Sequence, residues 1–244
     1  MQSIRILSTR VDDISLKDAL SLASSFLSDG SQHQIITANS IMLLETQSND
    51  NLKNVFEEAS LVIPESAGVL WAAGFLSRPL KEKIPGIDFM VFLLEQAQQK
   101  NYSVFFLGAE EGIIKKAVEQ IRNKFPKLKI AGFHNGFFSG SEEELIQQIK
   151  LSNADIIFAG LSLPFQEIWL NKNLLQLGVK MAMGVGGSFD VLSGNLKRAP
   201  KWMIALNAEW IFRIFQQPRR IVRVIKLLDF TLRVIREKTV AVFC

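Results

Sequence analysis

Short apolar runs rich in β-branched residues alternate with segments of helical periodicity from Ile4 to Val185. This alternation is typical of βα units that build a mostly parallel sheet. The runs predict strands at Ile4–Ser8, Gln34–Ala38, Leu61–Ile63, Ser103–Leu107, Lys129–Gly132, Asp155–Gly160 and Lys180–Met183. Helices are expected after most of them, including one over 88–100 and one starting at Ser141-Glu-Glu-Glu144, where acids occupy the first turn. The pattern therefore predicts an α/β fold.

A helix of a different kind is predicted beyond Pro218. Apolar residues recur there at helical spacing on one face, at Ile221, Val224, Ile225, Leu228, Leu232 and Ile235. Basic residues gather on the other face, at Arg219, Arg223, Lys226 and Arg233. Such a helix either packs its stripe on the protein body or lies in the interface of an anionic bilayer. The aromatic residues Trp202, Trp210, Phe212 and Phe215 nearby favour the membrane surface.

The basic charge is concentrated in the C-terminal part of the chain. The net charge is +4, but residues 197–244 carry eleven Lys or Arg against three acids, so residues 1–196 sum to −4. The 244 residues, 48% of them hydrophobic, suffice for one large α/β domain or two small ones. We predict a Rossmann-like parallel-sheet core over 1–196, with a subdivision near Asn101 left open, and a basic helical C-terminal appendage over 197–244.

Several classes of protein are disfavoured by composition. The single cysteine, Cys244, excludes an internal disulfide, which predicts a reducing compartment. His33 and His134 are the two histidines of the chain, so the usual zinc ligand sets are missing and no structural metal is expected. The start lacks the apolar region of a signal peptide, and the longest apolar run, 67–76, is about half the ~20 residues of a spanning helix. No recognised nucleic-acid motif accompanies the basic helix, and the body is acidic, so nucleic acid is not an expected partner.

Small or turn-forming residues follow several predicted strands, which marks candidate ligand sites because open α/β sheets bind ligands at the carboxyl ends of their strands. These segments are Thr37-Ala-Asn39, Pro64-Glu-Ser66, Leu107-Gly-Ala109, Ala159-Gly-Leu161 and Gly184-Val-Gly186. The run Gly184-Val-Gly-Gly-Ser-Phe-Asp190 lacks both the dinucleotide fingerprint spacing and the P-loop lysine. Its glycines allow backbone N–H groups to approach a diphosphate, or simply form a tight connection from strand to helix.

Polar residues near these ends are candidates for chemistry. Glu65, after a predicted strand and a proline, is placed either as a general base or as an exposed turn residue. Thr37 and Asn39 are placed to hydrogen-bond a sugar or to cap the next helix, and Gln166 and Glu167 to bind a ligand or to occupy a first helical turn. No Gly-x-Ser-x-Gly elbow occurs, which argues against an α/β-hydrolase, and no Asp-x-Asp pair offers an anchor for a divalent ion.

Taken in order, these motifs resemble the WecG/TagA/CpsF glycosyltransferase family. The resemblance is carried by Thr37-Ala-Asn39, Pro64-Glu-Ser-Ala-Gly68, Pro85-Gly-Ile-Asp88, Phe106-Leu-Gly108, Pro164-Phe-Gln-Glu167, Trp169, the Gly184–Asp190 run, Lys197-Arg-Ala-Pro200 and Glu209-Trp210. It covers nearly the whole chain. It implies an inverting transferase without metal or other cofactor that moves N-acetylmannosamine, or its uronic acid, from a UDP-sugar to a polyprenyl-diphosphate-linked N-acetylglucosamine. The product would serve a teichoic acid or another cell-surface polysaccharide, made at the inner face of the cell membrane.

The resemblance also implies roles for particular residues. Glu65 falls at the position of the acid that activates the acceptor hydroxyl, with Thr37, Lys83 and Gln166 at the other active-site positions. The glycine-ended loops, with neighbouring polar residues, would bind the substrates at Asn39, Gly108, Ala109, Gly160, Glu167, Gly184, Gly186, Gly187 and Asp190. The appendage would hold the enzyme on the membrane and supply Arg213, Arg220 and Arg223 to the diphosphate of the lipid acceptor or the leaving UDP.

Two positions depart from the family pattern. Glu65 replaces an aspartate and extends the carboxylate by one methylene, and Lys83 replaces an arginine and loses its bidentate fork. Two alternatives therefore remain: a family member that transfers another sugar, such as glucose, and a non-catalytic nucleotide-binding protein at the membrane. Association with further copies of the chain stays open.

Overall fold

Six strands form one parallel sheet, in the order β4-β3-β8-β7-β5-β6. The computed structural model describes residues 2–206 and 208–243, except for the side chains of residues 201, 205, 219, 220 and 241–243. The strands are β3 (His33–Ala38), β4 (Leu61–Pro64), β5 (Ser103–Gly108), β6 (Lys129–His134), β7 (Ile156–Gly160) and β8 (Met181–Gly184). The predicted α/β fold is confirmed, and each predicted strand of this sheet is found within two residues of its predicted bounds.

The first predicted strand, Ile4–Ser8, is found in part, but it is shorter than predicted and lies outside the parallel sheet. Its residues form β1 (Ser3–Ile6), which turns at Leu7 and Ser8 and pairs antiparallel with β2 (Thr9–Asp12) as a separate hairpin. Both turn residues have positive φ, 48° and 59°, as in the two-residue turns that match the twist of a hairpin. Neither is Gly, Asn or Asp, so the sequence carries no turn signal there. The hairpin lies beside the sheet, where the Asp12 carboxylate accepts the Val62 backbone N–H at 2.8 Å.

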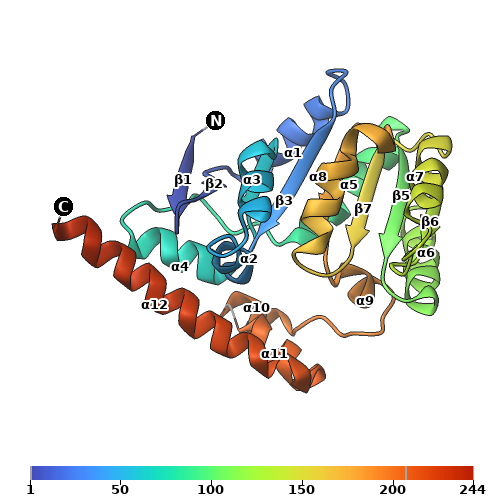
Figure 1. Ribbon diagram of the computed structural model, residues 1–244. Helices are drawn as coiled ribbons and strands as arrows, with labels where there is room; N and C mark the ends of the chain where they lie inside the picture. Colours follow the sequence, from blue (N-terminus) through green and yellow to red (C-terminus); the bar gives the residue numbers. More distant parts are fainter. Residues whose placement is uncertain (1, 207, 244) are drawn as a thin grey trace.

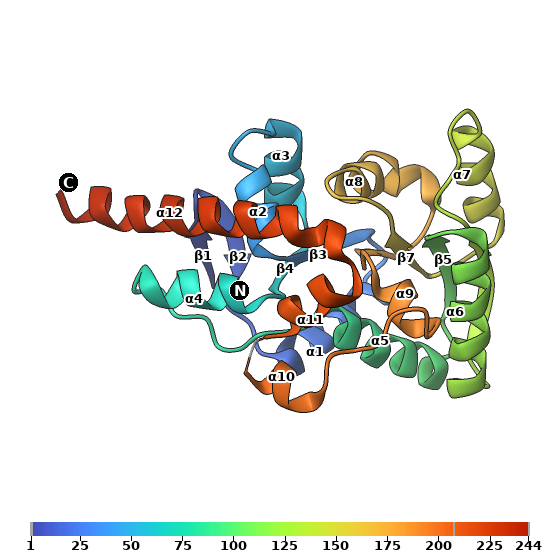
Figure 2. The ribbon, with the colours of Figure 1, turned by 90° about the horizontal axis from the view of Figure 1, so that it is seen from below.

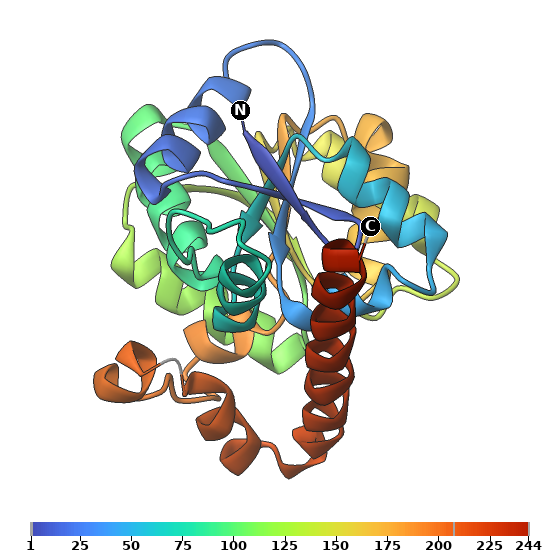
Figure 3. The ribbon, with the colours of Figure 1, turned by 90° about the vertical axis from the view of Figure 1, so that its left-hand side faces the viewer.

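Helices cover both faces of the sheet (Figure 3). One face packs against α1 (Leu16–Phe26), α5 (Gly86–Lys100), α6 (Glu111–Lys124) and α9 (Ser188–Leu192), and the other against α3 (Asp50–Glu58), α7 (Glu142–Leu151) and α8 (Phe165–Leu177). Alternate residues of a strand enter opposite cores: Phe106 and Phe158 are buried on the first face, and Phe105 and Ile157 on the second. Burial on both faces explains why these strands read as continuous apolar runs.

The remaining helices lie at the carboxyl edge of the sheet. They are α2 (Ser40–Glu45), α4 (Ala67–Phe75), α10 (Lys201–Ala205), α11 (Glu209–Gln216), the short 3-10 helix η1 (Pro218–Ile221) and α12 (Val222–Phe243). The strands in Figure 1 point down towards this edge, and the segment from α10 to α12 crosses beneath it. Seen from below in Figure 2, α12 runs alongside α2 and α4.

Few apolar contacts and several polar ones attach α12 to the body. Phe230 and Val234 are fully buried in the core beside α2 and α4. The Glu237 carboxylate accepts the Leu7 backbone N–H at 2.8 Å and pairs with Arg78 at 3.2 Å. Lys226 pairs with Glu45 at the end of α2. These contacts hold the helix in a defined place against the body.

The helix predicted beyond Pro218 is confirmed, and most of its apolar stripe points away from the body. Ile225, Leu228 and Leu232 are 68%, 61% and 67% exposed. Val224 is half-buried. None of the described helices combines the length and the apolar character that crossing a membrane requires.

Candidate active site

Residues from three neighbouring strands meet at the carboxyl edge of the sheet. Ala38 at the end of β3 pairs with Pro64 at the end of β4, so Glu65 emerges directly beside Asn39. On the other side of β3, the Thr37 hydroxyl donates to the Gly184 carbonyl, the last residue of β8, at 3.3 Å. The parallel register thus brings Thr37, Asn39, Glu65 and Gly184 together, although they are far apart in the sequence.

The Glu65 carboxyl group is held from several directions. Asn39 Nδ2 donates to Glu65 Oε2 at 3.5 Å, and the Gly86 backbone N–H, at the start of α5, also donates to this carboxylate. A side chain at position 86 would place its Cβ 2.9 Å from Glu65 Oε1 and 3.0 Å from Thr37 Cγ2. Only glycine therefore lets α5 begin this close to the carboxylate.

Burial raises the pKa of the Glu65 carboxyl above its ordinary value, and the positive charge of Arg213 is the largest influence that lowers it. Glu65 as a residue is half-buried, and its carboxyl group is the part turned inward. A desolvated carboxylate is a stronger base than one in water, which suits removal of a proton from a hydroxyl group.

Asn39 has two functions at this place. Its Oδ1 accepts the backbone N–H groups of Ile41 and Met42 at 3.1 Å, which caps α2, while its Nδ2 bonds Glu65. Capping of the next helix, one of the two roles expected from the sequence, is confirmed. Lys83 lies in the connection before α5, next to Ile84, whose backbone N–H donates to the Pro64 carbonyl at 2.8 Å. That bond places Lys83 in the segment flanking Glu65.

Gln166 joins the loops that follow β7 and β8. Its Oε1 accepts the Leu161 and Gly186 backbone N–H groups, both at 3.0 Å, and its Nε2 donates to Glu167 Oε1 at 2.6 Å. Gln166 and Glu167 are only 4% and 3% exposed. Burial and the charge of Glu65 raise the pKa of the Glu167 carboxyl to about 7. Both residues occupy the first turn of α8 and lie beneath Gly184, whose missing side chain leaves room for the two polar groups.

The other glycine-ended loops pack closely on one another. Gly108 ends β5 with φ +134°, and a Cβ there would lie 2.3 Å from the Gly160 carbonyl oxygen. A Cβ on Gly160 would lie 2.5 Å from the Phe189 ring and 2.7 Å from the Gly186 oxygen. Ala109 follows with φ 58° and donates its N–H to Gly160 at 3.1 Å. The glycines therefore permit three loops to converge, and Gly187 leads from the last of them into α9.

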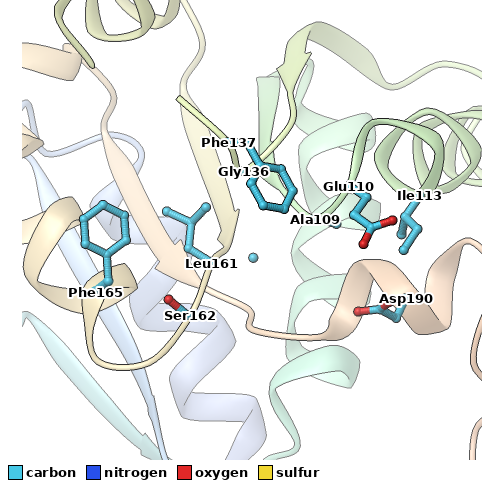
Figure 4. Close-up of a pocket in the computed structure, with 10 residues that line it drawn as sticks. Ala109, Glu110, Ile113, Gly136, Phe137, Leu161, Ser162, Phe165 and Asp190 are labelled. Atoms are coloured by element: carbon cyan, nitrogen blue, oxygen red, sulfur yellow. The ribbon is translucent and has the colours of Figure 1, made fainter. Parts of the chain in front are cut away.

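A pocket of about 320 Å³ opens where these loops converge (Figure 4). It is lined by Ala109, Glu110, Ile113, Gly136, Phe137, Gly160, Leu161, Ser162, Phe165 and Asp190. Phe165 and Leu161 lie on one side, and Glu110 and Asp190 on the other (Figure 4). Within the sheet, the chain passes from β5 to β6 in one direction and from β7 to β8 in the opposite direction. The pocket therefore lies at a topological switch point, which is the usual binding place in open α/β sheets.

The appendage brings arginines to the same edge. Arg213 on α11 forms an ion pair with Glu209 at 2.9 Å, and its positive charge lowers the pKa of Glu65. Arg223 lies in the first turn of α12. Although the residue is exposed, desolvation of its guanidinium, and after it the charge of Arg213, lower the pKa of that group. The two arginines are thus neighbours. The side chain of Arg220, the third predicted arginine, lies outside the described residues.

One further contact ties the appendage to the site. Arg198 Nη2 bonds Asp88 Oδ2 at 2.6 Å, which fixes the segment before α10 to the first turn of α5. Gly86, two residues before Asp88, is the residue that approaches Glu65. The position of the appendage and the start of α5 are therefore coupled.

The predicted site residues fall into two groups with Gln166 between them. Thr37, Asn39, Glu65, Lys83, Glu167 and Arg213 belong to the edge at β3, β4 and β8, whereas Ala109, Gly160 and Asp190 line the pocket, with Gly108 packed against Gly160 behind it. The sequence reasoning missed Phe137 and Phe165, the aromatic rings of the pocket. Asn135-Gly136 after a predicted strand was the available signal, because it is the kind of turn that marked the other loops.

Comparison with known proteins shows the family to which this chain belongs. The model of the glycosyl transferase WecG/TagA/CpsF family matches residues 4–241. A relative from Bacillus spizizenii is 32% identical over 217 residues, 89% of this chain and 84% of the relative, and one from Staphylococcus aureus (strain MW2) is 30% identical over 237 residues, 96% and 93%. A third, from Bacillus subtilis (strain 168), is 34% identical over 185 residues, 76% and 72%. All three are named N-acetylglucosaminyldiphosphoundecaprenol N-acetyl-beta-D-mannosaminyltransferase. The chain belongs to the WecG/TagA/CpsF family of glycosyltransferases.

Proposed function

We propose that this glycosyltransferase moves N-acetylmannosamine from a UDP-sugar to N-acetylglucosamine carried on a polyprenyl diphosphate, with inversion at the transferred carbon. The names of the relatives support this acceptor and this sugar. The observation that carries the proposal is the position of the Glu65 carboxylate, desolvated and under the electrostatic influence of Arg213, at the edge of the sheet that also holds the pocket. A base, a cation and a nucleotide-sized pocket are the parts that such a transfer needs.

The pocket suits the nucleoside end of the donor. Phe137 and Phe165, 74% and 47% exposed, offer apolar ring faces to a base, and Asp190 offers a hydrogen-bond acceptor to ribose hydroxyl groups. Of the described residues that line the pocket, none is Lys or Arg. We therefore place the diphosphate outside it, towards the backbone N–H groups of the Gly184–Gly187 loop and the arginines of the appendage.

The reaction is a single displacement. Glu65 accepts the proton of the acceptor hydroxyl group, and the oxygen attacks the anomeric carbon from the side opposite the diphosphate. The bond between that carbon and the diphosphate oxygen breaks, and UDP leaves with the electron pair. Arg213 and Arg223 stabilise the charge that grows on the departing diphosphate, and such stabilisation specific to the transition state accelerates the reaction.

We also propose that the 197–244 appendage holds the enzyme on the surface of an anionic membrane, where the lipid acceptor resides. Apolar residues that face away from the body support this, since Ile221, Ile225, Leu228, Leu232 and Ile235 follow one another along the outer side of α12 and its approach. Trp202 and Phe215 on α10 and α11 are 63% and 79% exposed. A helix that is apolar on the side opposite its packing face is suited to a lipid interface.

The test is release of UDP from UDP-N-acetylmannosamine, with and without lipid-linked N-acetylglucosaminyl diphosphate, for the wild type and Glu65→Gln. We expect release that depends on the acceptor and falls about 10²–10⁴-fold in the variant, the usual contribution of a general base, while UDP affinity stays nearly unchanged. Release from UDP-glucose alone would reassign the sugar. UDP binding without turnover of any donor would reassign the protein as a nucleotide-binding protein.

A further inference from the structure

Glu167 is a buried acid to which the transfer mechanism gives no task. It lies in the first turn of α8, is 3% exposed, and its Oε1 accepts Gln166 Nε2 at 2.6 Å. Its Oε2 is buried and has no hydrogen-bond partner within the described part of the chain. Burying an ionised carboxylate with one oxygen unsatisfied costs free energy, and protonation of the group removes the buried charge.

The orientation of Gln166 determines what Glu167 must offer. Two backbone N–H groups, of Leu161 and Gly186, donate to Gln166 Oε1, so this atom is the amide oxygen and Nε2 is the donor. Glu167 Oε1 must then accept. A neutral carboxylic acid meets this requirement with its proton on Oε2, the atom that lacks a partner.

The charged groups around α8 favour the neutral form. Burial first, and then the negative charge of Glu65, raise the pKa of Glu167 to about 7. From α7, Glu142 bonds Trp169 and Asn173, and from α3, Glu58 bonds Asn171, so the acids of both neighbouring helices are bonded to other residues of α8. Within the described chain, no Lys or Arg forms an ion pair with Glu167.

We propose that Glu167 is a positioning residue that retains a proton during transfer, so that it fixes Gln166 between two substrate loops and adds no negative charge of its own beside Glu65. The division of roles, one acid protonated and its neighbour ionised, is a known way of setting up acid and base groups in one site. The consequence for catalysis rests on the proposed transfer between two diphosphate substrates. Loss of the Glu167 proton would add a second negative charge where those anions bind.

The first test needs no substrate. Because the pKa of Glu167 in the fold lies above the ordinary value of 4.5, the unfolded chain loses this proton before the folded chain does, and stability falls as pH rises from 4.5 to about 7. Glu167→Gln keeps the acceptor oxygen and cannot ionise. We expect its melting temperature to exceed that of the wild type by a margin that grows over this range and is constant above it. Glu58→Gln, on the exposed pair with Asn171, is the matched control and should show no such trend.

The second test is the pH dependence of transfer. In the wild type, kcat/KM for the UDP-sugar should decline tenfold per pH unit above about 7, and in Glu167→Gln this decline should be absent. Glu167→Ala, which lacks the acceptor for Gln166, should be slow at every pH. A decline of equal steepness in wild type and Glu167→Gln would overturn the proposal.

The carboxyl stretching band gives an answer that depends on neither the thermal stability of a Glu167 variant nor activity. A protonated acid that titrates near pH 7 and persists in Glu65→Gln supports the proposal, and a Glu167 that is ionised well below that pH refutes it. If no donor is turned over, the proposed function fails while the band and the melting curves still determine the protonation of Glu167.

Discussion

The positive charge of Arg213 lowers the pKa of the Glu65 carboxyl group, which burial raises. Arg213 belongs to α11 in the appendage, and Glu65 follows β4 in the body. Glu209, which forms an ion pair with Arg213, raises the pKa of Glu65. The appendage is therefore electrostatically part of the site as well as a surface for attachment.

Arg213→Ala should shift the acidic limb of the transfer pH profile to higher pH. Without the positive charge, the pKa of Glu65 rises further, so the carboxylate needed as base forms only at higher pH. Transfer rates measured from acidic to neutral pH for wild type and variant test this. Arg233→Ala is the control, because Arg233 pairs with Asp229 on α12 and does not act on Glu65. An acidic limb that stays in place in Arg213→Ala would separate Arg213 from the base.

Gly108→Ala should lower both stability and UDP affinity. The new Cβ would lie 2.3 Å from the Gly160 oxygen, at a φ of +134° that side chains rarely adopt, which costs about 1–3 kcal/mol. Melting temperature and calorimetric titration with UDP measure the two effects. Gly112→Ala is the matched control: no heavy atom lies within 4 Å of its Cβ, and the residue is helical, so stability should be unchanged or slightly higher. Equal behaviour of the two variants would refute the close loop packing.

Phe137→Ala should weaken UDP binding by about 5–150-fold, because stacking of a base on an aromatic ring contributes about 1–3 kcal/mol. The same change at Phe165 tests the other ring of the pocket. Leu175→Ala, an 82% exposed residue on the same helix as Phe165, is the control. UDP affinity that is unaffected by either phenylalanine substitution would move the nucleoside out of this pocket.

Leu232→Glu should reduce binding to vesicles that contain anionic lipid by about tenfold or more. Burial of a leucine side chain contributes about 1.5–3 kcal/mol, and the new charge opposes the lipid surface. Leu232 is 67% exposed, so the fold should tolerate the change. Leu151→Glu is the control, since Leu151 is 77% exposed at the end of α7, away from the appendage. Cosedimentation with vesicles measures both, and equal binding of the two variants would contradict the membrane role of α12.

Hydrophobic periodicity predicted the sheet well because its strands, apart from the edge strand β6, are buried on both faces, which forces continuous apolar runs. It extended the strand at Ile4–Ser8 two residues too far, because Leu7 and Ser8 make a turn without Gly, Asn or Asp. Periodicity also identified the stripe on α12, but not which side of the helix meets the body. Phe230 and Val234 do so, and Ile225 and Leu232 face away.

The amino-acid sequence is enough to establish the α/β architecture, the basic appendage, the family, and the strand ends that carry Thr37, Glu65 and Gly184. These follow from local patterns and from motifs that each lie in one short segment. Folding is what brings Glu65 under the influence of the Arg213 charge, joins two loops through Gln166, and buries Glu167 with one oxygen unpaired among the described residues. Strand order and helix packing set these relationships, because burial and charge depend on neighbours that the chain brings together only by folding.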